Sequence, residues 1–334
     1  MHTAEIKLGF DDVLIQPIPS SVNSRKDVNL LTTYSFKKKD GSTFYWQGIP
    51  IVAANMDTIG TFKVASILSK YRMLTCLHKH YSLEDYKMNN FESAYVAVTT
   101  GIDDSGIEKT LDILYHYPQI RFVCIDVANG YTDSFLKKVE HISNACKEQI
   151  IIAGNITTYE GSKNIRDAGA DVVKVGIGNG SACKTKQVTG VGYPQLSAIQ
   201  DSRGHLTVGH TTYVSDIKLM SDGGCKQVGD ISKAFVAGAK FVMLGGMLAG
   251  HKETGLDYYG MSSERAMNKY SGGMASYRTS EGTTLEIEDK GYLDKTILHI
   301  MGGLRSMCTY VNCRNLSDVI DNTSGKIVLN RVQK

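Results

Sequence analysis

Eight short runs of apolar, mostly β-branched residues recur along the chain and constrain its fold more than any other feature. The runs lie at residues 50–56, 73–79, 95–101, 122–129, 150–156, 172–178, 217–223 and 241–247. Their apolar character is nearly continuous, which is typical of strands covered on both faces. Between them, residues 62–71, 107–115, 132–145, 160–168 and 231–237 have the apolar spacing of helices. Strand–helix alternation predicts a parallel sheet, and eight units predict closure into a (β/α)8 (TIM) barrel. An open doubly wound sheet is the alternative.

No linker or low-complexity stretch divides the 334 residues, so we expect a single barrel domain over 1–334. Residues 1–49 place Tyr-Ser-Phe and Phe-Tyr-Trp on either side of Asp40-Gly41, which predicts an N-terminal hairpin that covers one barrel end. Residues 248–300 are rich in Gly, Ser, Tyr and Glu and predict a lid segment at the barrel mouth. The stretch 205–214 leads to no expectation of shape.

Composition narrows the class of protein. Apolar residues make up 42% and charged residues 21%, as in soluble globular proteins. The net charge of +3 comes without a Lys/Arg block, which argues against a nucleic-acid partner. We interpret the densest basic run, 36–41, as a solvated hairpin tip. The chain shows no secretory leader and no apolar stretch of about 18 residues, so we expect a cytoplasmic protein without membrane contact.

The cysteines and histidines do not form a metal pattern. Seven cysteines, an odd number, are scattered without a Cys-x-x-Cys pair, which is typical of reduced thiols in a cytosolic protein. His78 and His80 share one face of a predicted strand, but no acidic or Cys partner is near them in sequence. This favours packing or hydrogen bonding over metal ligation.

Polar residues and glycines gather where the predicted strands end, which is where barrel enzymes have their active sites. They are Asn55, Met56 and Asp57; His78, Lys79 and His80; Thr99, Thr100 and Gly101; Asp126, Asn129 and Gly130; Gly154 and Asn155; Gly178 to Cys183; Ser221 to Gly224; and Gly245 and Gly246. Any one group is explained by a turn, but all eight together favour a site.

The strongest local signal is the glycine-rich loop 174–185, which ends in Cys183-Lys-Thr. Closely spaced glycines let backbone N–H groups converge on an anion or carbonyls on a cation. Nearby lysines favour a thiolate, so Cys183 is a candidate nucleophile beside a bound phosphate. A buried, inert cysteine is the alternative. The glycine turns at 221–224 and 244–246 match the usual phosphate position of barrels, and Asp222 could hold a ribose diol.

Collinear stretches over nearly the whole chain resemble the inosine monophosphate (IMP) dehydrogenase/guanosine monophosphate (GMP) reductase family, and within it the reductase branch. The stretches begin at Phe10-Asp-Asp-Val-Leu-Ile, Ala53-Ala-Asn-Met-Asp-Thr, His78-Lys-His-Tyr-Ser, Asp126-Val-Ala-Asn-Gly-Tyr, Val175-Gly-Ile-Gly, Thr189-Gly-Val-Gly-Tyr-Pro, Ser221-Asp-Gly-Gly-Cys, Tyr277-Arg-Thr-Ser-Glu-Gly and Gly302-Gly-Leu-Arg-Ser. Matches this long are too extensive to be motif coincidences.

The resemblance implies an NADPH-dependent reductive deamination of GMP to IMP that releases ammonia. Cys183 would attack C2 of the purine and form a covalent thioimidate, which a hydride from the nicotinamide reduces. Thr185 and Glu281 match the pair that handles protons on the leaving ammonia. These three residues are the implied catalytic set.

The resemblance also implies binding residues. The substrate would be held by Ser181, Asp222, Gly223, Gly224, Gly245, Gly246, Gly260, Met261, Ser262, Arg278, Thr279, Ser280 and Gly282. The cofactor would contact Lys79, Asp126, Val127, Ala128, Met261, Tyr277 and Arg278. Ser24, Arg25, Ser306, Met307, Cys308 and Thr309 match positions that reach a neighbouring subunit's cofactor, so a homotetramer is implied.

The family's loop site for a monovalent cation such as K+ maps to Gly178, Gly180, Cys183 and Lys186. Here Asn179 stands where a proline is usual, and Lys184 and Lys186 replace Thr- and Arg-type neighbours, which puts the cation in doubt. The stretch 251–260 is shorter than in typical members. The insert at 205–214 has no counterpart.

Three alternatives to a reductase can be compared with the sequence. An IMP dehydrogenase usually carries regulatory modules after strand two, but only residues 81–94 separate the second and third strands here. It also has an Arg-Tyr pair and an amide where this chain has Tyr277-Arg278 and Glu281. A catalytically silent nucleotide-binding barrel would predict a damaged nucleophile or proton relay, yet Cys183, Thr185 and Glu281 are all present. A flavin-dependent barrel is disfavoured because the cysteine loop has no role there.

Overall fold

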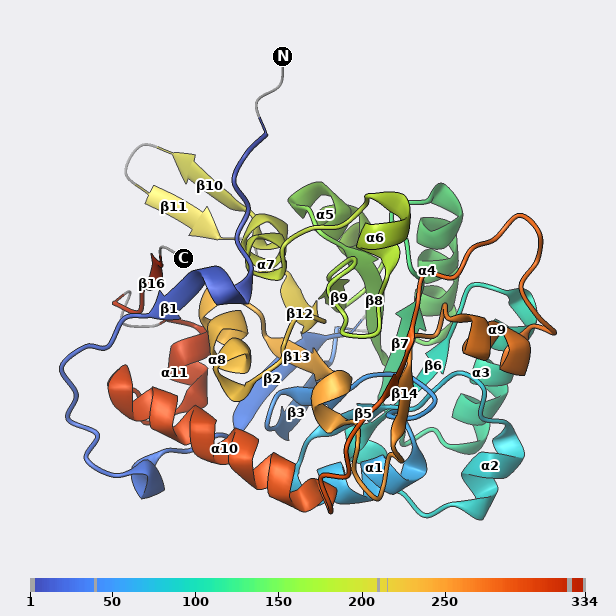
Figure 1. The fold of residues 1–334 in the computed structure, drawn as a ribbon, viewed down its shortest axis with the longest axis horizontal. Helices are drawn as coiled ribbons and strands as arrows, with labels where there is room; N and C mark the ends of the chain where they lie inside the picture. Colours follow the sequence, from blue (N-terminus) through green and yellow to red (C-terminus); the bar gives the residue numbers. More distant parts are fainter. Residues whose placement is uncertain (1–3, 39–40, 209–210, 215, 323–325, 333–334) are drawn as a thin grey trace.

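The computed structural model describes residues 4–38, 41–208, 211–214, 216–322 and 326–332, and eight parallel strands in it close into a barrel (Figure 1). In order around the barrel they are β4 (Ile51–Ala53), β5 (Leu74–Cys76), β6 (Val96–Thr100), β7 (Phe122–Asp126), β8 (Ile150–Ile156), β9 (Val172–Val175), β12 (Lys218–Asp222) and β13 (Phe241–Leu244). Each lies within a predicted run, and β13 pairs with β4 to complete the ring. The barrel prediction is confirmed, and the open-sheet alternative is wrong.

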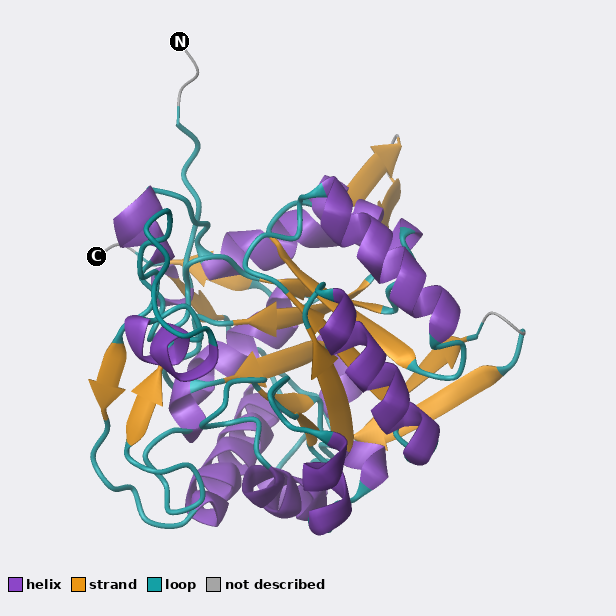
Figure 2. Ribbon diagram, turned by 90° about the vertical axis from the view of Figure 1, so that its right-hand side faces the viewer, coloured by secondary structure: helices purple, strands orange, loops and turns teal. Residues whose placement is uncertain are grey.

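Helices surround the strands (Figure 2). The longer ones are α3 (Asp104–His116), α4 (Asp133–Ala145), α5 (Tyr159–Asp167), α7 (Gln195–Arg203), α8 (Val228–Ala237) and α10 (Leu293–Tyr310). The shorter ones are α1 (Phe62–Leu68), α2 (Leu83–Met88), α6 (Thr185–Thr189), α9 (Glu264–Tyr270) and α11 (Leu316–Ile320), with 3-10 turns η1 (Phe10–Asp12), η2 (Arg25–Asp27), η3 (Ser69–Tyr71), η4 (Ser93–Tyr95) and η5 (Gly246–Leu248). The sequence predicted α1, α3, α4, α5 and α8, but not α7 or α10.

Side-chain caps begin the predicted helices soon after the strands end. Thr61, Asp103, Thr132 and Thr158 each accept a hydrogen bond from a backbone N–H three residues later, at the starts of α1, α3, α4 and α5. Such caps satisfy an N–H that a helix leaves without a partner. The connections at the carboxyl ends of these strands are therefore short and well defined.

An N-terminal hairpin closes the opposite end of the barrel. It consists of β2 (Thr32–Lys37) and β3 (Thr43–Gly48). The rings of Tyr34 and Trp46 lie 4.8 and 5.4 Å from that of Phe241, and Phe36 packs edge-on against Phe122. Phe241 and Phe122 are the first residues of β13 and β7, so the hairpin covers the amino ends of the strands. This confirms the predicted cap and leaves the carboxyl ends for ligands.

The interpretation of the basic run 36–41 as a solvated hairpin tip is wrong for Lys38. Lys39 and Asp40 lie outside the described residues. The Lys38 ammonium pairs with Glu148 at 3.1 Å, and only 6% of the Lys38 side chain is exposed. The tip is therefore pinned to the loop between α4 and β8.

Three further strand pairs lie outside the barrel. β1 (Val13–Ile15) pairs with β16 (Leu329–Arg331) and joins the two ends of the chain. β10 (His205–Val208) and β11 (Thr211–Val214) form a hairpin in the stretch without an expected shape. β14 (Asp257–Tyr259) pairs with β15 (Thr284–Glu286) within the predicted lid segment.

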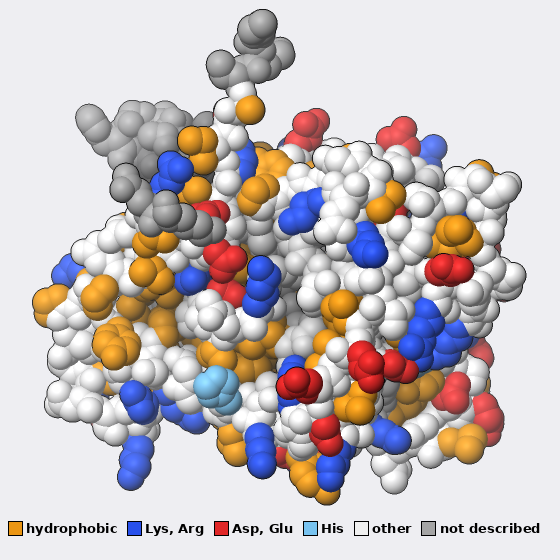
Figure 3. Space-filling view, viewed as in Figure 1, with side chains coloured by type: hydrophobic (Ala, Val, Ile, Leu, Met, Phe, Trp, Pro, Cys, Tyr) orange, Lys and Arg blue, Asp and Glu red, His pale blue; other side chains and the backbone are white. Residues whose placement is uncertain are grey.

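All seven cysteines are free thiols. Among the described residues, no helix is long and apolar enough to cross a membrane. On the face shown in Figure 3, Lys and Arg side chains are interspersed with Asp and Glu.

Truncating the hairpin plug should strongly destabilise the protein. Trp46 is 2% exposed and contacts four aromatic rings, so Trp46→Ala should lower the free energy of unfolding by about 3–5 kcal/mol. The neighbouring Tyr45 is 67% exposed, and Tyr45→Ala should change it by less than about 0.5 kcal/mol. Denaturant unfolding measures both. Equal losses in the two variants would show that the plug does not support the barrel.

Candidate active site

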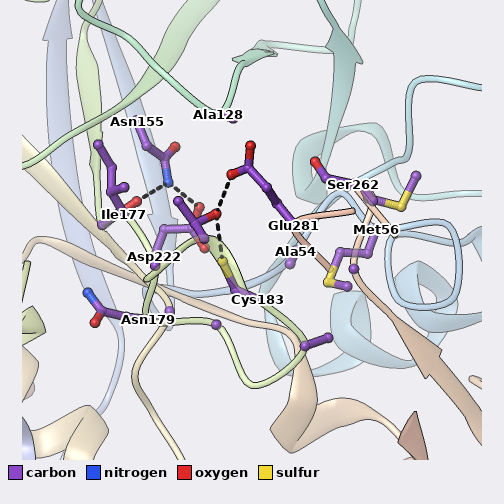
Figure 4. A pocket seen from close by; sticks show the side chains of 18 of the residues that line it. Ala54, Met56, Ala128, Asn155, Ile177, Asn179, Cys183, Asp222, Ser262 and Glu281 are labelled. Carbon is purple, nitrogen blue, oxygen red and sulfur yellow. Dashed lines mark hydrogen bonds between the residues drawn. The ribbon is translucent and has the colours of Figure 1, made fainter. Parts of the chain in front are cut away.

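A cavity of about 240 Å³ opens at the carboxyl ends of the barrel strands (Figure 4). Its walls come from the loops after β4, β7, β8, β9 and β12, together with the lid segment. The lining residues are Ala54, Asn55, Met56, Asp126, Val127, Ala128, Asn155, Gly176, Ile177, Gly178, Asn179, Gly180, Ala182, Cys183, Thr185, Asp222, Gly223, Tyr258, Gly260, Met261, Ser262 and Glu281. Polar groups from the ends of several separate strands therefore line one cavity, as the sequence predicted.

Cys183, Thr185 and Glu281 form a continuous chain of hydrogen bonds in this cavity (Figure 4). The Cys183 thiol donates to Thr185 Oγ1 at 3.3 Å, and the Thr185 hydroxyl donates to Glu281 Oε2 at 2.8 Å. A thiol linked through a hydroxyl to a carboxylate can pass its proton away and become a nucleophile. The geometry therefore supports covalent chemistry at Cys183.

The glycine loop after β9 brings Cys183 to the cavity. Gly176 has φ +145°, and a Cβ there would lie 2.0 Å from the Asp222 carbonyl oxygen, so only glycine fits this close approach. The Cys183 N–H donates to the Gly180 carbonyl at 3.0 Å, which closes the turn before α6. Cys183 is partly exposed, unlike Cys76 and Cys124, which are buried in the barrel.

Backbone pairing attaches the lid segment to the cysteine loop. Lys184 N–H donates to the Glu281 carbonyl at 2.7 Å, and Thr283 N–H donates to the Ala182 carbonyl at 2.9 Å. Cys183 and Gly282 thereby form an antiparallel bridge. Glu281 is fixed beside Thr185 by main-chain bonds, although the two residues are 96 positions apart.

A ring of small and polar groups borders the cavity at the ends of β12 and β13. A Cβ at Gly246 would lie 2.3 Å from the Ser181 hydroxyl oxygen, and Ser181 hydrogen-bonds with buried Tyr258. Gly224 N–H donates to the Asn179 carbonyl at 3.0 Å. Ser181, Gly245 and Gly246, predicted separately, thus share one region next to Gly223 and Asp222. The arrangement suits a phosphate and ribose.

Two carboxylates on the cavity wall share one buried lysine. Lys174 pairs with Asp126 and lies 3.2 Å from Asp222 Oδ2. Burial opposes the charge of Lys174, but Asp126 and Asp222 keep the pKa of the ammonium well above its usual value. Asn155 donates to Asp222 Oδ2 at 2.9 Å and to the Gly176 carbonyl at 2.8 Å.

The lid segment is held to the barrel by Asp57, which follows β4. Its Oδ2 accepts hydrogen bonds from Tyr259, Lys269 and Tyr270. Burial alone would raise the pKa of Asp57, but these donors hold it below the ordinary value. Tyr270 in turn stacks on His80, with ring centroids 3.4 Å apart. The contacts join the loops after β4 and β5 to α9 of the lid.

Comparison with known proteins agrees with this geometry. A family model described as the IMP dehydrogenase / GMP reductase domain matches residues 7–330. The chain belongs to that family. It is 45% identical to GMP reductase 1 of Homo sapiens over 95% of this chain and 93% of that protein. It is 46% identical to GMP reductase of Enterobacter sp. (strain 638) and 44% identical to GMP reductase 2 of Bos taurus, each over 96% of this chain and 94% of the relative.

Of the residues implied by the family resemblance, one group lies together at the cavity. It comprises Cys183, Thr185, Glu281, Asp222, Gly223, Gly260, Met261, Ser262, Asp126, Val127, Ala128, Gly178 and Gly180. Gly224, Ser181, Gly245, Gly246, Ser280 and Gly282 do not line it but adjoin lining residues in sequence or space. Arg278 and Thr279 do not line it either, and both are exposed. Tyr277 is 88% exposed and Lys79 is also exposed.

Another implied group lies elsewhere on the subunit. Ser24 and Arg25, at η2, pack beside α10, which carries Ser306, Met307, Cys308 and Thr309. None of these six residues lines the cavity. Cys308 is fully buried, and burial raises the pKa of its thiol to about 12. Its side chain is therefore not placed to touch a cofactor, whereas Ser306 and Thr309 are partly exposed.

Lys186, one of the residues of the monovalent-cation site that the resemblance implies, lies against the glycine loop. Its Nζ is 3.2 Å from Asn179 Oδ1, and its stem lies against Gly178 and Gly192. Among the described residues, no cluster of His, Cys, Asp and Glu could hold a metal ion. His78 stacks on Tyr81, and His80 on Tyr270.

Some groups at the site were missed by sequence reasoning. In the sequence, Lys174 stood out only as the first residue of the glycine-rich loop 174–185. Asn155 and Asp57 stood out only because they lie at the ends of predicted strands. Gln195, which donates to the Val175 carbonyl and the Ser221 hydroxyl, was not singled out. The signal for Lys174 was present, because a lysine inside the apolar run 172–175 must find a partner when buried.

The His80 stack should make stability depend on pH. Burial lowers the pKa of His80 to about 4, whereas an unfolded histidine titrates near about 6.5. Between these values the unfolded chain binds a proton that the folded chain does not, so stability is lost as pH falls from about 6.5 to about 4. His80→Phe keeps a ring on Tyr270 without this titration. Calorimetry should show its Tm falling less steeply than that of the wild type over this range, and parallel curves would contradict the assignment.

Proposed function

We propose that this protein is a GMP reductase that converts GMP to IMP and ammonia, with NADPH as the hydride donor. The observation that carries the proposal is the hydrogen-bonded chain from Cys183 through Thr185 to Glu281 in the cavity. The family membership and the relatives named GMP reductase support it.

The first chemical step is attack by Cys183. Its sulfur bonds to C2 of the guanine, and the bond from C2 to the amino nitrogen breaks. The leaving amino group needs one proton to depart as ammonia, and the Cys183 thiol has one to lose. The Thr185 hydroxyl and Glu281 carboxylate can take the proton from sulfur and return it to the nitrogen. Protons therefore balance within these three residues, and a thioimidate remains on Cys183.

The second step reduces C2. The nicotinamide of bound NADPH supplies a hydride to that carbon. The C2–S bond then breaks with its electron pair returning to Cys183, which releases IMP and leaves a thiolate, and one proton taken up from solvent restores the thiol. Asp126, Val127, Ala128 and Met261 would hold the cofactor, because they line the same cavity as the nucleophile.

The nucleotide would be oriented by groups on the other side of the cavity. Asp222 can accept hydrogen bonds from the ribose hydroxyls. The glycine turns at 223–224 and 245–246, with Ser181, leave room for a phosphate close to the backbone. Gly260, Met261 and Ser262 would contact the base from the lid segment, where they line the cavity beside Glu281.

Two features favour a reductase over an IMP dehydrogenase. Glu281 provides a carboxylate where the dehydrogenase is expected to carry an amide, and its contact with Thr185 fits protonation of ammonia. The connection between β5 and β6, residues 77–95, contains α2 and η4 and no inserted domain. The monovalent cation that the resemblance implies stays a prediction, and no step of the reaction is assigned to it.

An absorbance assay tests the proposed function. The purified protein mixed with GMP and NADPH should oxidise NADPH and release IMP and ammonia in equal amounts. Cys183→Ala should remove the activity, and Glu281→Gln should lower kcat by about 10² or more, since a positioned acid–base group contributes about that much. Faster formation of reduced cofactor from IMP and oxidised cofactor would contradict the proposal, as would nucleotide binding without turnover.

We also infer that the cofactor site is shared between subunits of a homotetramer. The implied cofactor residues fall into two groups, one at the cavity and one around η2 and α10. In Figure 1 the end of α10 beside η2 lies at the left, whereas α6 and β14, next to the cavity, lie to its right. A cofactor bound by both groups would have to bridge two copies of the chain.

Complementation tests this sharing. Cys183→Ala chains lack the nucleophile, and Arg25→Glu chains would bind NADPH weakly, because a carboxylate would face the cofactor phosphates. Co-expressed, the two should form mixed tetramers with some intact sites and recover activity. Light scattering checks the assembly. Activity no higher than the sum of the separate variants would contradict a shared site.

A further inference from the structure

Lys174 is a buried charge inside a barrel that is otherwise mostly apolar. It lies in β9, and its side chain is 1% exposed. The barrel residues near its ammonium include the thiol of Cys124, and Val172 and Val175 of the same strand are fully buried. An isolated ammonium in such surroundings would be very unfavourable, so its partners must explain its presence.

Its partners are two carboxylates on the cavity wall, at the ends of two separate strands. Asp126 ends β7 and contacts Lys174 through Oδ1, while Asp222 ends β12 and contacts it through Oδ2. Asn155 donates to the same oxygen of Asp222. Each carboxylate therefore has one oxygen bound from inside the barrel, and both carboxylates line the cavity, where a ligand could reach their other oxygens.

The two carboxylates belong to different halves of the proposed site. Asp222 stands on the side of the glycine turns that suit ribose and phosphate, and Asp126 stands with Val127 and Ala128 on the proposed cofactor side. Without a cation between them, two negative groups facing one cavity would repel each other and attract protons. The single positive charge of Lys174 contacts both carboxylates, so it reduces both their mutual repulsion and their tendency to bind protons.

We propose that Lys174 is a positioning residue that orients Asp222 toward the nucleotide and Asp126 toward the cofactor, and so links the two halves of the site. The inference rests on the proposed GMP reductase function and deepens it. Lys174 does not line the cavity, so it would act only through the two carboxylates. Its loss should weaken binding of both ligands more than it slows the chemical step at Cys183.

The decisive variant is Lys174→Met, which keeps the length of the side chain and removes its charge. KM for GMP and KM for NADPH should each rise about tenfold or more, because each carboxylate loses a charge-assisted partner. The value of kcat should change by less than either KM. If Lys174→Met does not yield folded protein, Lys174→Gln keeps a polar donor and should raise both KM values in the same pattern.

Two matched variants separate positioning from a general structural role. Lys233 is another buried lysine with an acidic partner, since it lies 3.6 Å from Asp230 and donates to the Phe10 carbonyl. Lys233→Met should lower Tm yet leave both KM values within about twofold of wild type. Asn155→Ala removes a donor to Asp222 but not to Asp126, so it should raise KM for GMP and leave KM for NADPH nearly unchanged.

The outcomes separate this inference from the proposed function. A wild type that does not reduce GMP would overturn the function, and calorimetric titration of IMP into wild type and Lys174→Met would then still test whether Lys174 supports nucleotide binding. Equal IMP affinities in those two proteins would overturn the inference. With an active wild type, a folded Lys174→Met that changes only kcat, or only one KM, would also overturn it.

Discussion

Closure of the barrel between β13 and β4 is the constraint on which the site depends. Once the ring is closed, every strand ends at the same rim, and residues far apart in sequence meet there. The hairpin β2–β3 fills the other end with aromatic rings, and so makes the two ends of the barrel chemically different. The carboxyl rim holds the charged and hydrogen-bonding groups that line the cavity, among them Cys183, Asp126 and Asp222.

Much of this arrangement could be predicted from the sequence, because continuous apolar runs identify buried parallel strands almost directly. Two of the longer helices could not. α7 buries the polar side chains of Gln195, Ser197 and Ser202 along with its apolar ones, so it lacks an amphipathic pattern. α10 contains Gly302-Gly303, which resembles a turn. In the structure a Cβ at Gly303 would lie 2.4 Å from Val228, so the glycine serves close packing against α8.

The candidate site, like the fold, could be predicted from the sequence only in part. The glycine loop and Cys183 were visible locally, since spacing alone suggests a nucleophile near an anion. Glu281 was one acid among many in a polar stretch, and only family resemblance singled it out. Its contact with Thr185 depends on backbone pairing between segments 96 residues apart. Lys269 and Asp57 are 212 residues apart, and such long-range pairs leave no local signature in a single sequence.

Main-chain pairing also suits the chemistry that we propose. A proton relay works only if its hydrogen bonds stay within a few tenths of an ångström of their best lengths. Side-chain contacts alone would not fix where the backbone of Glu281 lies. The bridge from Cys183 to Gly282 fixes the backbone on both sides of the relay. Asp57 holds α9 of the lid to the barrel, through Lys269 and Tyr270. The hydrogen bond from Thr185 to Glu281 is therefore made between two segments whose backbones are attached to each other.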